Sequence, residues 1–231
     1  MPGKAITFRT MDIGGDKPVE ALGLEQEQNA FLGYRAIRIC LDRPELFLTQ
    51  LRALLRASAF GKVQIMFPMI ATLEELRRAK KYVAQAKEQL AQKGQAFDPN
   101  APVGMMVEVP AAAVLARQFA READFFSIGS NDLTQYTMAA DRMNPKVEHL
   151  SNPMGPAVLT LIAQTIQAAK QAGIPCSVCG ELAGMVEAVP VLLGLGLEKF
   201  SVSPGKLLAV RRAIAGCSEE EAQRAARRAL S

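Results

Sequence analysis

The sequence predicts an α/β protein whose parallel strands alternate with helices, as in a (β/α) TIM-type barrel. Short apolar segments recur along the chain and lack the polar alternation of strands that are exposed on one face. Amphipathic segments lie between them, and this alternation is typical of βα units and a parallel sheet. Strands are expected at residues 5–9, 63–68, 103–109, 125–128, 176–179 and 200–202.

The intervening helices have recognisable ends. The segment Thr72-Leu-Glu-Glu75 is a capping box that begins a helix running to about Gln92, and Gly94 ends that helix. Ser218 precedes three glutamates, which favour the start of a final charged helix because acidic groups stabilise a helix N-terminus. Further helices are expected at residues 156–171 (ended by Gly173), 186–193 and 207–214.

The number of strands bears on whether the barrel is complete. Six strands are expected here, whereas a closed (β/α)₈ barrel has eight. Residues 11–29 form a sizeable unassigned segment, and their polar character favours a loop over two hidden strands. No internal repeat or low-complexity tract divides the chain. The prediction is therefore one domain over residues 1–231, a truncated barrel with about six of the eight βα units.

Composition restricts the class of protein. The chain has 231 residues, 49% of them hydrophobic, and a net charge of +4 that is too diffuse to indicate nucleic-acid binding. Four cysteines are too few for a secreted disulfide scaffold, and the first residues do not resemble a signal peptide. No stretch reaches the ~18 uninterrupted apolar residues of a membrane span. We therefore expect a cytoplasmic protein with no membrane insertion.

Polar and reactive residues lie at the carboxyl ends of the expected strands. Arg9 ends the first strand, Glu108 ends the third, Asn131 and Asp132 follow the fourth, and Cys179 ends the fifth. In a βα barrel the catalytic groups collect at this edge. The repetition of the pattern, more than any one residue, predicts a functional site there.

Glu108 and Asp132 are candidate metal ligands. Each offers a carboxylate from a neighbouring strand, and Mg²⁺ usually takes one or two carboxylates together with water and substrate oxygens. A structural alternative stays open for both residues. Glu108 could form an ion pair, and Asp132 could cap a helix that begins near Leu133. A carboxylate at the end of an apolar strand is costly unless it is paired or metal-bound, which favours a site at Glu108.

Three arginines are candidates for holding a phosphate group: Arg9, Arg35 and Arg142. A guanidinium keeps its charge and can donate two parallel hydrogen bonds to a phosphate. Arg9 is distinguished by its position at a strand end. Spacing alone does not distinguish Arg35 or Arg142 from the exposed arginines that are common in this chain.

Cys176 and Cys179 form a CxxC sequence inside the fifth expected strand. A thioredoxin-type motif lies at a helix start, and a zinc site needs further ligands, which the isolated Cys40 and Cys217 do not offer by their spacing. Cys179 precedes Gly180 and Glu181 and could act as a thiol acid or base. For Cys176 we expect a small buried apolar group.

Several segments together resemble Enzyme I of the bacterial phosphotransferase system, the phosphoenolpyruvate–protein phosphotransferase family. They are FRTMDIGGDK at residues 8–17, FLGYRAIR at 31–38, MFPMI at 66–70, GMMVEVP at 104–110, SIGSNDLTQYTMAADR at 127–142 and CGELAG at 179–184. The similarity covers nearly the whole chain, and the combination is specific to this family and its pyruvate phosphate dikinase and phosphoenolpyruvate synthase relatives.

The resemblance implies a barrel that binds phosphoenolpyruvate and Mg²⁺ and forms a homodimer. By matching the motifs, it implies that Arg9 and Arg35 hold the phosphate, that Glu108 and Asp132 bind the metal, and that Asn131, Asp132 and Arg142 contact the substrate. It also implies that Cys179 protonates the enolate carbon on the way to pyruvate. The roles of Arg35 and Arg142 come from the resemblance alone.

The chain also departs from the family pattern. Family members carry two further barrel strands before the FRTMDIGGDK-like segment, a domain with the phosphorylated histidine, and a helical domain that docks the carrier protein HPr. His149 is the only histidine here, and its surroundings do not match the phosphohistidine motif. We therefore expect a fragment of the enzyme. The alternatives are a catalytically silent module that binds phosphoenolpyruvate or dimerises, and the barrel of a dikinase or synthase relative.

Overall fold

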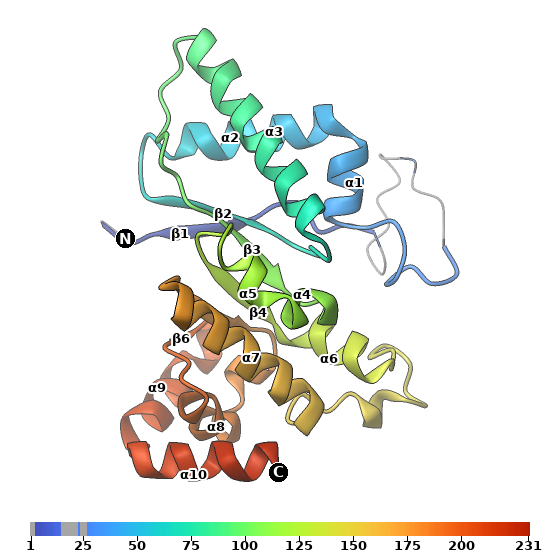
Figure 1. The fold of residues 1–231 in the computed structure, drawn as a ribbon, viewed down its shortest axis with the longest axis vertical. Helices are drawn as coiled ribbons and strands as arrows, with labels where there is room; N and C mark the ends of the chain where they lie inside the picture. The colour runs from blue at the N-terminus through green and yellow to red at the C-terminus, as the bar shows by residue number, and fades with distance from the viewer. Residues whose placement is uncertain (1–2, 15–22, 24–26) are drawn as a thin grey trace. The chain divides into compact units, whose positions relative to one another are not determined.

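The computed structural model describes residues 3–14, 23 and 27–231. Within these residues the protein has one six-stranded sheet with the strand order β1-β2-β3-β4-β5-β6 (Figure 1). Every recorded strand pairing is parallel. The strands are β1 (Ile6–Arg9), β2 (Val63–Phe67), β3 (Val103–Val107), β4 (Phe126–Gly129), β5 (Cys176–Cys179) and β6 (Lys199–Phe200). A parallel sheet in sequential order with helical crossovers confirms the predicted βα barrel class, with six strands in the described part of the chain.

The chain divides into two compact units, Met1–Met105 and Met106–Ser231. The first contains β1, β2, the start of β3 and the helices α1 (Ile37–Asp42), α2 (Pro44–Ala57) and α3 (Leu73–Gln92). Helices α2 and α3 pack against each other, and α2 also packs on β2. Phe47 of α2 lies edge-on to both Phe67 and Tyr82, with ring centroids 5.8 and 5.7 Å away, which fills the core of this unit.

The predicted capping box of α3 is confirmed. The Glu75 backbone N–H donates to the Thr72 hydroxyl over 3.1 Å, and the Glu75 carboxylate accepts from the Thr72 N–H over 2.9 Å. Helix α3 begins at Leu73 and ends at Gln92, as predicted. Helices α1 and α2 were not predicted. The short α1 is buried on most sides and offers no clear helical periodicity. Helix α2 is amphipathic and begins at Pro44, so its pattern was readable from the sequence and was missed.

The second unit contains the end of β3, strands β4 to β6 and most of the helices. These are α4 (Pro110–Val114), α5 (Ala116–Phe119), α6 (Ser130–Met138), α7 (Pro156–Ala172), α8 (Val189–Gly194), α9 (Leu207–Gly216) and α10 (Glu219–Leu230). Short 3₁₀ turns lie at Glu148–Leu150, Leu182–Gly184, Val186–Ala188 and Pro204–Lys206. Helix α7 packs on α4, α5 and α10, and α10 packs closely on α8. The predicted ends of α7 at Gly173 and the start of α10 after Ser218 are confirmed.

Two helix predictions need correction. The helix expected over residues 186–193 is a 3₁₀ turn, Val186–Ala188, followed by α8, because Pro190 has no N–H to donate to the preceding turn. The helix expected near Leu133 begins at Ser130. In the predicted loop at 11–29, residues 15–22 and 24–26 lie outside the described residues, and residues 11–14 contain no helix. Within the described chain, no helix combines the length and apolar character that crossing a membrane requires.

Candidate substrate and metal site

In the first unit, two of the predicted phosphate-binding arginines meet on one carboxylate. Arg9 Nη1 lies 2.8 Å from Asp12 Oδ2, and Arg35 Nη2 lies 3.0 Å from Asp12 Oδ1. The side chains of Asp12 and Arg35 are 4% and 3% exposed, whereas Arg9 is 40% exposed. Two guanidiniums around one carboxylate carry a surplus positive charge, and the exposed Arg9 makes that charge accessible to an anion.

The local backbone explains why Arg35 reaches the end of β1. The Ala36 N–H donates to the Ile13 carbonyl over 2.9 Å, which ties the segment after β1 to the segment before α1. Gly14 lies between them with φ of +92°, and an added Cβ there would lie 2.7 Å from the Tyr34 carbonyl oxygen. Only glycine fits this close approach. The Arg35 guanidinium also lies 5.8 Å from the centre of the Phe31 ring, as a cation–π contact.

Asp12 was not among the predicted site residues. It lies three residues after Arg9, in the polar segment that follows the strand, and its proximity to a strand end was the available signal. The sequence offered no way to pair it with Arg35, because the two residues lie 23 positions apart.

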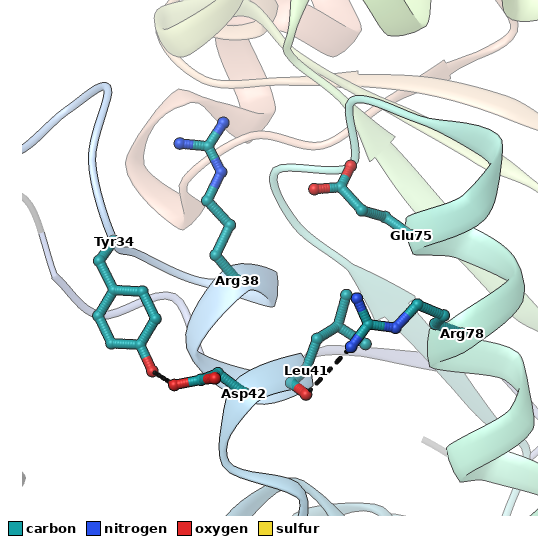
Figure 2. Close-up of a pocket in the computed structure, with 6 residues that line it drawn as sticks. All are labelled: Tyr34, Arg38, Leu41, Asp42, Glu75 and Arg78. Atoms are coloured by element: carbon teal, nitrogen blue, oxygen red, sulfur yellow. Dashed lines mark hydrogen bonds between the residues drawn. The ribbon is translucent and has the colours of Figure 1, made fainter.

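An open pocket of about 350 Å³ lies in the same unit between α1 and α3, and Figure 2 shows its lining residues. They are Tyr34, Arg38, Leu41, Asp42, Glu75 and Arg78. The Tyr34 hydroxyl donates to Asp42 over 2.5 Å; burial and then this carboxylate raise the pKa of Tyr34. Arg38 Nη1 donates to the carbonyls of Leu32 and Gly33, over 2.7 and 2.8 Å, and so braces the turn before Arg35. None of the predicted site residues lines this pocket.

In the second unit, Glu108 follows the last residue of β3 and is 1% exposed. Gly129, at the end of β4, makes room for it. A Cβ added at Gly129 would lie 2.8 Å from Glu108 Oε2 and 2.9 Å from both Glu108 Cβ and Met106 Sδ. The Glu108 carboxylate therefore lies against Gly129 at the end of β4. Gly129 in turn precedes Asp132 by three residues in the sequence.

Asp132 lies in the first turn of α6 and is 8% exposed. Its Oδ1 is 2.8 Å from Arg142 Nη1, and the Arg142 backbone N–H donates to the side chain of Gln135 over 3.1 Å. These contacts hold the segment after α6 against the helix. The helix-cap interpretation of Asp132 is wrong, because Gly129 occupies the N-cap position and no side chain caps this helix.

The donor set around Glu108 and Asp132 fits Mg²⁺. Both acids are buried and lie beside the end of β4, where their oxygens could bind a cation. A carboxylate has enough lone pairs to accept a hydrogen bond from an arginine and to bind a cation at the same time. Across residues 3–14, 23 and 27–231, no group of three or more His, Cys, Asp or Glu side chains is arranged to hold a metal ion. Mg²⁺ needs no such all-protein cage, because water and phosphate oxygens complete its coordination.

Asn131 of α6 contacts the loop that directly follows Cys179 of β5. The Asn131 Oδ1 accepts from the Glu181 backbone N–H over 2.9 Å, just after β5. The Cys179 thiol donates to the Ile128 carbonyl over 3.4 Å and accepts from the Ser127 hydroxyl over 3.7 Å. β4 and β5 pair in parallel with Gly129 opposite Cys179, so this thiol lies at the same strand end as Glu108.

The other cysteines have different surroundings. Cys176 and Cys179 both lie in β5, as predicted, rather than at a helix start. Burial raises the pKa of Cys176 to about 12, which keeps it a neutral thiol. Burial also raises the pKa of Cys40 to about 12, and the nearby Asp12 adds to the shift. All four cysteines are free thiols.

The predicted site residues thus fall into two groups. Arg9 and Arg35 are joined by Asp12 in the first unit. The second unit gathers the remaining residues at the carboxyl ends of β3, β4 and β5: Glu108, Asn131, Asp132, Arg142 and Cys179. A parallel βα sheet with polar and reactive side chains at the ends of its strands is the arrangement of the βα-barrel enzyme class.

Sequence comparison identifies the family within that class. The chain belongs to the PEP-utilising enzymes, whose PEP-binding domain matches residues 1–218. It is 55% identical to the phosphoenolpyruvate-protein phosphotransferase of Bacillus subtilis over 96% of this chain and 39% of that protein. The protein of the same name from Geobacillus stearothermophilus is 54% identical over 100% of this chain and 40% of its own length. The chain therefore spans about two fifths of these relatives.

Solved structures show a similar fold at low identity. A citrate lyase from Burkholderia xenovorans superposes with a TM-score of 0.56 and 18% identity, over 78% of this chain and 57% of that chain. A malate synthase from Haloferax volcanii superposes with a TM-score of 0.55 and 14% identity, over 74% and 52% of the two chains. At these identities the likeness concerns the fold alone.

Proposed function

We propose that this chain is the phosphoenolpyruvate- and Mg²⁺-binding domain of a phosphotransferase-system Enzyme I. In that role it supports transfer of the phosphoryl group from phosphoenolpyruvate to a histidine on another domain, with release of pyruvate. The observation that carries the proposal is the meeting of Arg9 and Arg35 on one buried carboxylate, in a chain 55% identical to a phosphoenolpyruvate-protein phosphotransferase.

The arginines bind the phosphoryl group in this proposal. Arg9 and Arg35 present guanidiniums that Asp12 holds in place, and phosphoryl transfer depends mainly on positioning and on neutralising negative charge. Arg142 and Asn131 offer further donors to the substrate in the second unit, where Arg142 is held by Asp132. Asp132 thereby serves both the substrate-binding and the metal-binding groups.

Glu108 and Asp132 hold Mg²⁺ in the proposal. The bound ion supplies a positive charge that stabilises the phosphoryl oxygens. Glu108 is well placed for this because Gly129 leaves space for its carboxylate beside the end of β4. The near-complete burial of both acids keeps bulk water from competing for their oxygens.

Cys179 is the proposed proton donor. The phosphorus–oxygen bond of phosphoenolpyruvate breaks, and the phosphoryl group passes to a histidine nitrogen of the other domain. The enolate that is left takes a proton at its methylene carbon from the Cys179 thiol, which gives pyruvate and a thiolate. The thiolate then recovers a proton from solvent. The contacts of the thiol with Ser127 and Ile128 hold it at the strand end where this transfer would occur.

The partners belong to the proposal as well. The relatives are more than twice as long as this chain, so the rest of such an enzyme has room for the phosphohistidine domain. The carrier protein HPr is a separate expected partner of the full-length enzyme. We also propose a homodimer that works in the cytoplasm, where phosphoenolpyruvate is available.

A hydrogen-exchange experiment tests the proposal without the histidine domain. The chain is incubated with pyruvate and Mg²⁺ in heavy water, and the deuterium in the methyl group is measured by mass spectrometry or NMR. We expect incorporation by the native chain and by Cys217→Ala, and loss of it in Cys179→Ala. Incorporation that persists in Cys179→Ala would contradict the role of this thiol.

Calorimetric titration with phosphoenolpyruvate and Mg²⁺ completes the test. Binding without any deuterium incorporation would favour a catalytically silent binding module. Absence of both binding and incorporation would contradict the proposal that this chain is a substrate-binding domain.

A further inference from the structure

The loop after β5 is tied to the first turn of α6 by two hydrogen bonds on consecutive residues. The Ser130 hydroxyl donates to the Cys179 carbonyl over 2.7 Å, and the Glu181 N–H donates to Asn131 Oδ1 over 2.9 Å. The two bonds lie on either side of Gly180 and join residues about fifty positions apart in the sequence. The proposed proton donor and a proposed substrate-binding residue are therefore connected through Ser130, Gly180 and Glu181.

Gly180 lets this loop approach the helix. Its φ is +84°, and an added Cβ would meet Ser130 Oγ and, at 2.7 Å, Asn131 Oδ1. No other residue type fits such a position without moving both side chains. The loop and the helix start are consequently packed as closely as their hydrogen bonds allow.

The bond from Glu181 also sets the orientation of the Asn131 amide. A backbone N–H can only donate, so the side-chain atom that it contacts must be the carbonyl oxygen. The Asn131 Nδ2 is then the donor end of this amide, opposite the bonded oxygen. A donor in a fixed direction suits an anionic or carbonyl oxygen of a substrate.

Ser130 is fully buried, and its hydroxyl donates to the backbone carbonyl of Cys179. The Cys179 thiol is held separately, by the Ile128 carbonyl and the Ser127 hydroxyl. Ser130 therefore restrains the peptide group of Cys179, while contacts on β4 restrain its sulfur. Without the Ser130 bond, the Asn131–Glu181 bond would remain, but the Cys179 peptide group would lose its own tie to α6.

We infer that Ser130 is a positioning residue that holds the Cys179 thiol in register with the Asn131 amide, so that the proton donor and the substrate-binding donor keep one fixed geometry. Ser130 acts through Cys179 and has no contact with the reacting atoms in this inference. The inference rests on the proposed function for its catalytic consequence, but the restraint on Cys179 can be tested independently.

The first experiment compares Ser130→Ala with Ser130→Thr in the pyruvate deuterium exchange. Alanine removes the hydroxyl and threonine keeps it, so we expect about a tenfold or larger loss of exchange in Ser130→Ala and substantial recovery in Ser130→Thr. Affinity for phosphoenolpyruvate with Mg²⁺ should change little in either variant, because the Asn131–Glu181 bond stays. Thr165→Val is the matched control, since it removes a buried hydroxyl bond of 2.8 Å within α7.

Exchange in Ser130→Ala equal to that in Thr165→Val would overturn the inference. So would equal losses in the alanine and threonine variants, because a purely steric role would not distinguish the hydroxyl.

A second experiment does not depend on catalysis. The rate of Cys179 alkylation by iodoacetamide is measured by peptide mass spectrometry, with Cys217 in the same sample as the internal reference. We expect a severalfold change of the Cys179 rate relative to Cys217 in Ser130→Ala and none in Thr165→Val. Suppose that the alkylation rate of Cys179 changes in Ser130→Ala but the native chain exchanges no deuterium into pyruvate. That result would contradict the proposed function and would support the positioning role of Ser130. An unchanged rate would overturn the positioning role.

Discussion

At the scale of single residues, Asp12 connects three groups of the first unit: Arg9, Arg35 and the Cys40 thiol. Its buried carboxylate contacts the exposed Arg9 and the buried Arg35, and it lies close enough to Cys40 to raise the pKa of that thiol further. Removing one partner of a buried ion pair leaves the other charge without compensation, which costs more than the pair itself contributes. Asp12 should therefore affect stability as well as phosphate binding.

Asp12→Asn is expected to destabilise the protein. The amide cannot neutralise two guanidiniums, and Arg35 is 3% exposed, so we expect a loss of about 3 kcal/mol in the free energy of unfolding. Chemical denaturation measures this loss. Glu220→Gln, which breaks the exposed pair with Arg224, is the control and should leave the denaturation midpoint unchanged. Equal losses of stability in the two variants would show that the buried contacts of Asp12 with Arg9 and Arg35 contribute no more to stability than an exposed ion pair.

The buried thiol of Cys40 should make the free energy of unfolding depend on pH. Its thiol is fully buried with a pKa of about 12, whereas an unfolded thiol has a pKa of about 9. The unfolded chain therefore loses this proton first, and the free energy of unfolding should fall as the pH rises from about 9 toward about 12. Cys40→Ala should reduce the slope over this range, as measured by denaturation at several pH values. An unchanged slope would contradict the buried neutral thiol.

At the scale of elements, the structure differs from the sequence prediction at α8, where Pro190 divides the expected helix, and at α6, where a contact with another strand bears on the helix start. The capping boxes of α3 and α10 follow the sequence, because their hydrogen bonds join residues three apart. The start of α6 at Ser130 does not follow it. Ser130 is held there by the Cys179 carbonyl, which belongs to another strand.

The packing of α8 on α10 gives a prediction at this scale. A Cβ on Gly194 would overlap the Ala222 carbonyl oxygen and lie 2.8 Å from Ala226 Cβ. Gly194→Ala should separate the two helices and cost about 1–3 kcal/mol of stability, measured by thermal or chemical denaturation.

Gly216→Ala is the matched control for this substitution. Gly216 is the last residue of α9 and has nothing within 4 Å of an added Cβ, so alanine there should be neutral or slightly stabilising. If Gly194→Ala were equally harmless, the close approach of α8 and α10 would be contradicted.

At the scale of the whole molecule, the sheet positions chemistry that no single element contains. Glu108 follows β3, Asp132 lies on α6 and Arg142 follows that helix, yet Gly129 and the Asp132–Arg142 ion pair bring them to one end of the strands. Parallel strands share their carboxyl ends at one edge, so a sequential sheet gathers residues that are distant in the chain.

The proposed metal ligands give the prediction at this scale. Glu108→Ala and Asp132→Ala should each abolish the Mg²⁺-dependent part of phosphoenolpyruvate binding, measured by calorimetry with Mg²⁺ and then with a chelator. Glu198→Ala removes an exposed carboxylate outside this group and is the control. Retention of the Mg²⁺ dependence in both site variants would contradict the assignment of the metal to Glu108 and Asp132.

The sequence by itself determined the strands, the ends of α3 and α7, the start of α10, and the positions of Arg9, Glu108, Asp132 and Cys179 at or just after strand ends. These features depend on hydrophobic periodicity and capping, which involve neighbouring residues and are readable along the chain. Only the tertiary structure decided that Asp12 joins Arg9 to Arg35, that Gly129 makes room for Glu108, and that Ser130 holds the end of β5. Each of these contacts joins different elements, and its energy depends on burial and geometry that arise only when the chain has folded.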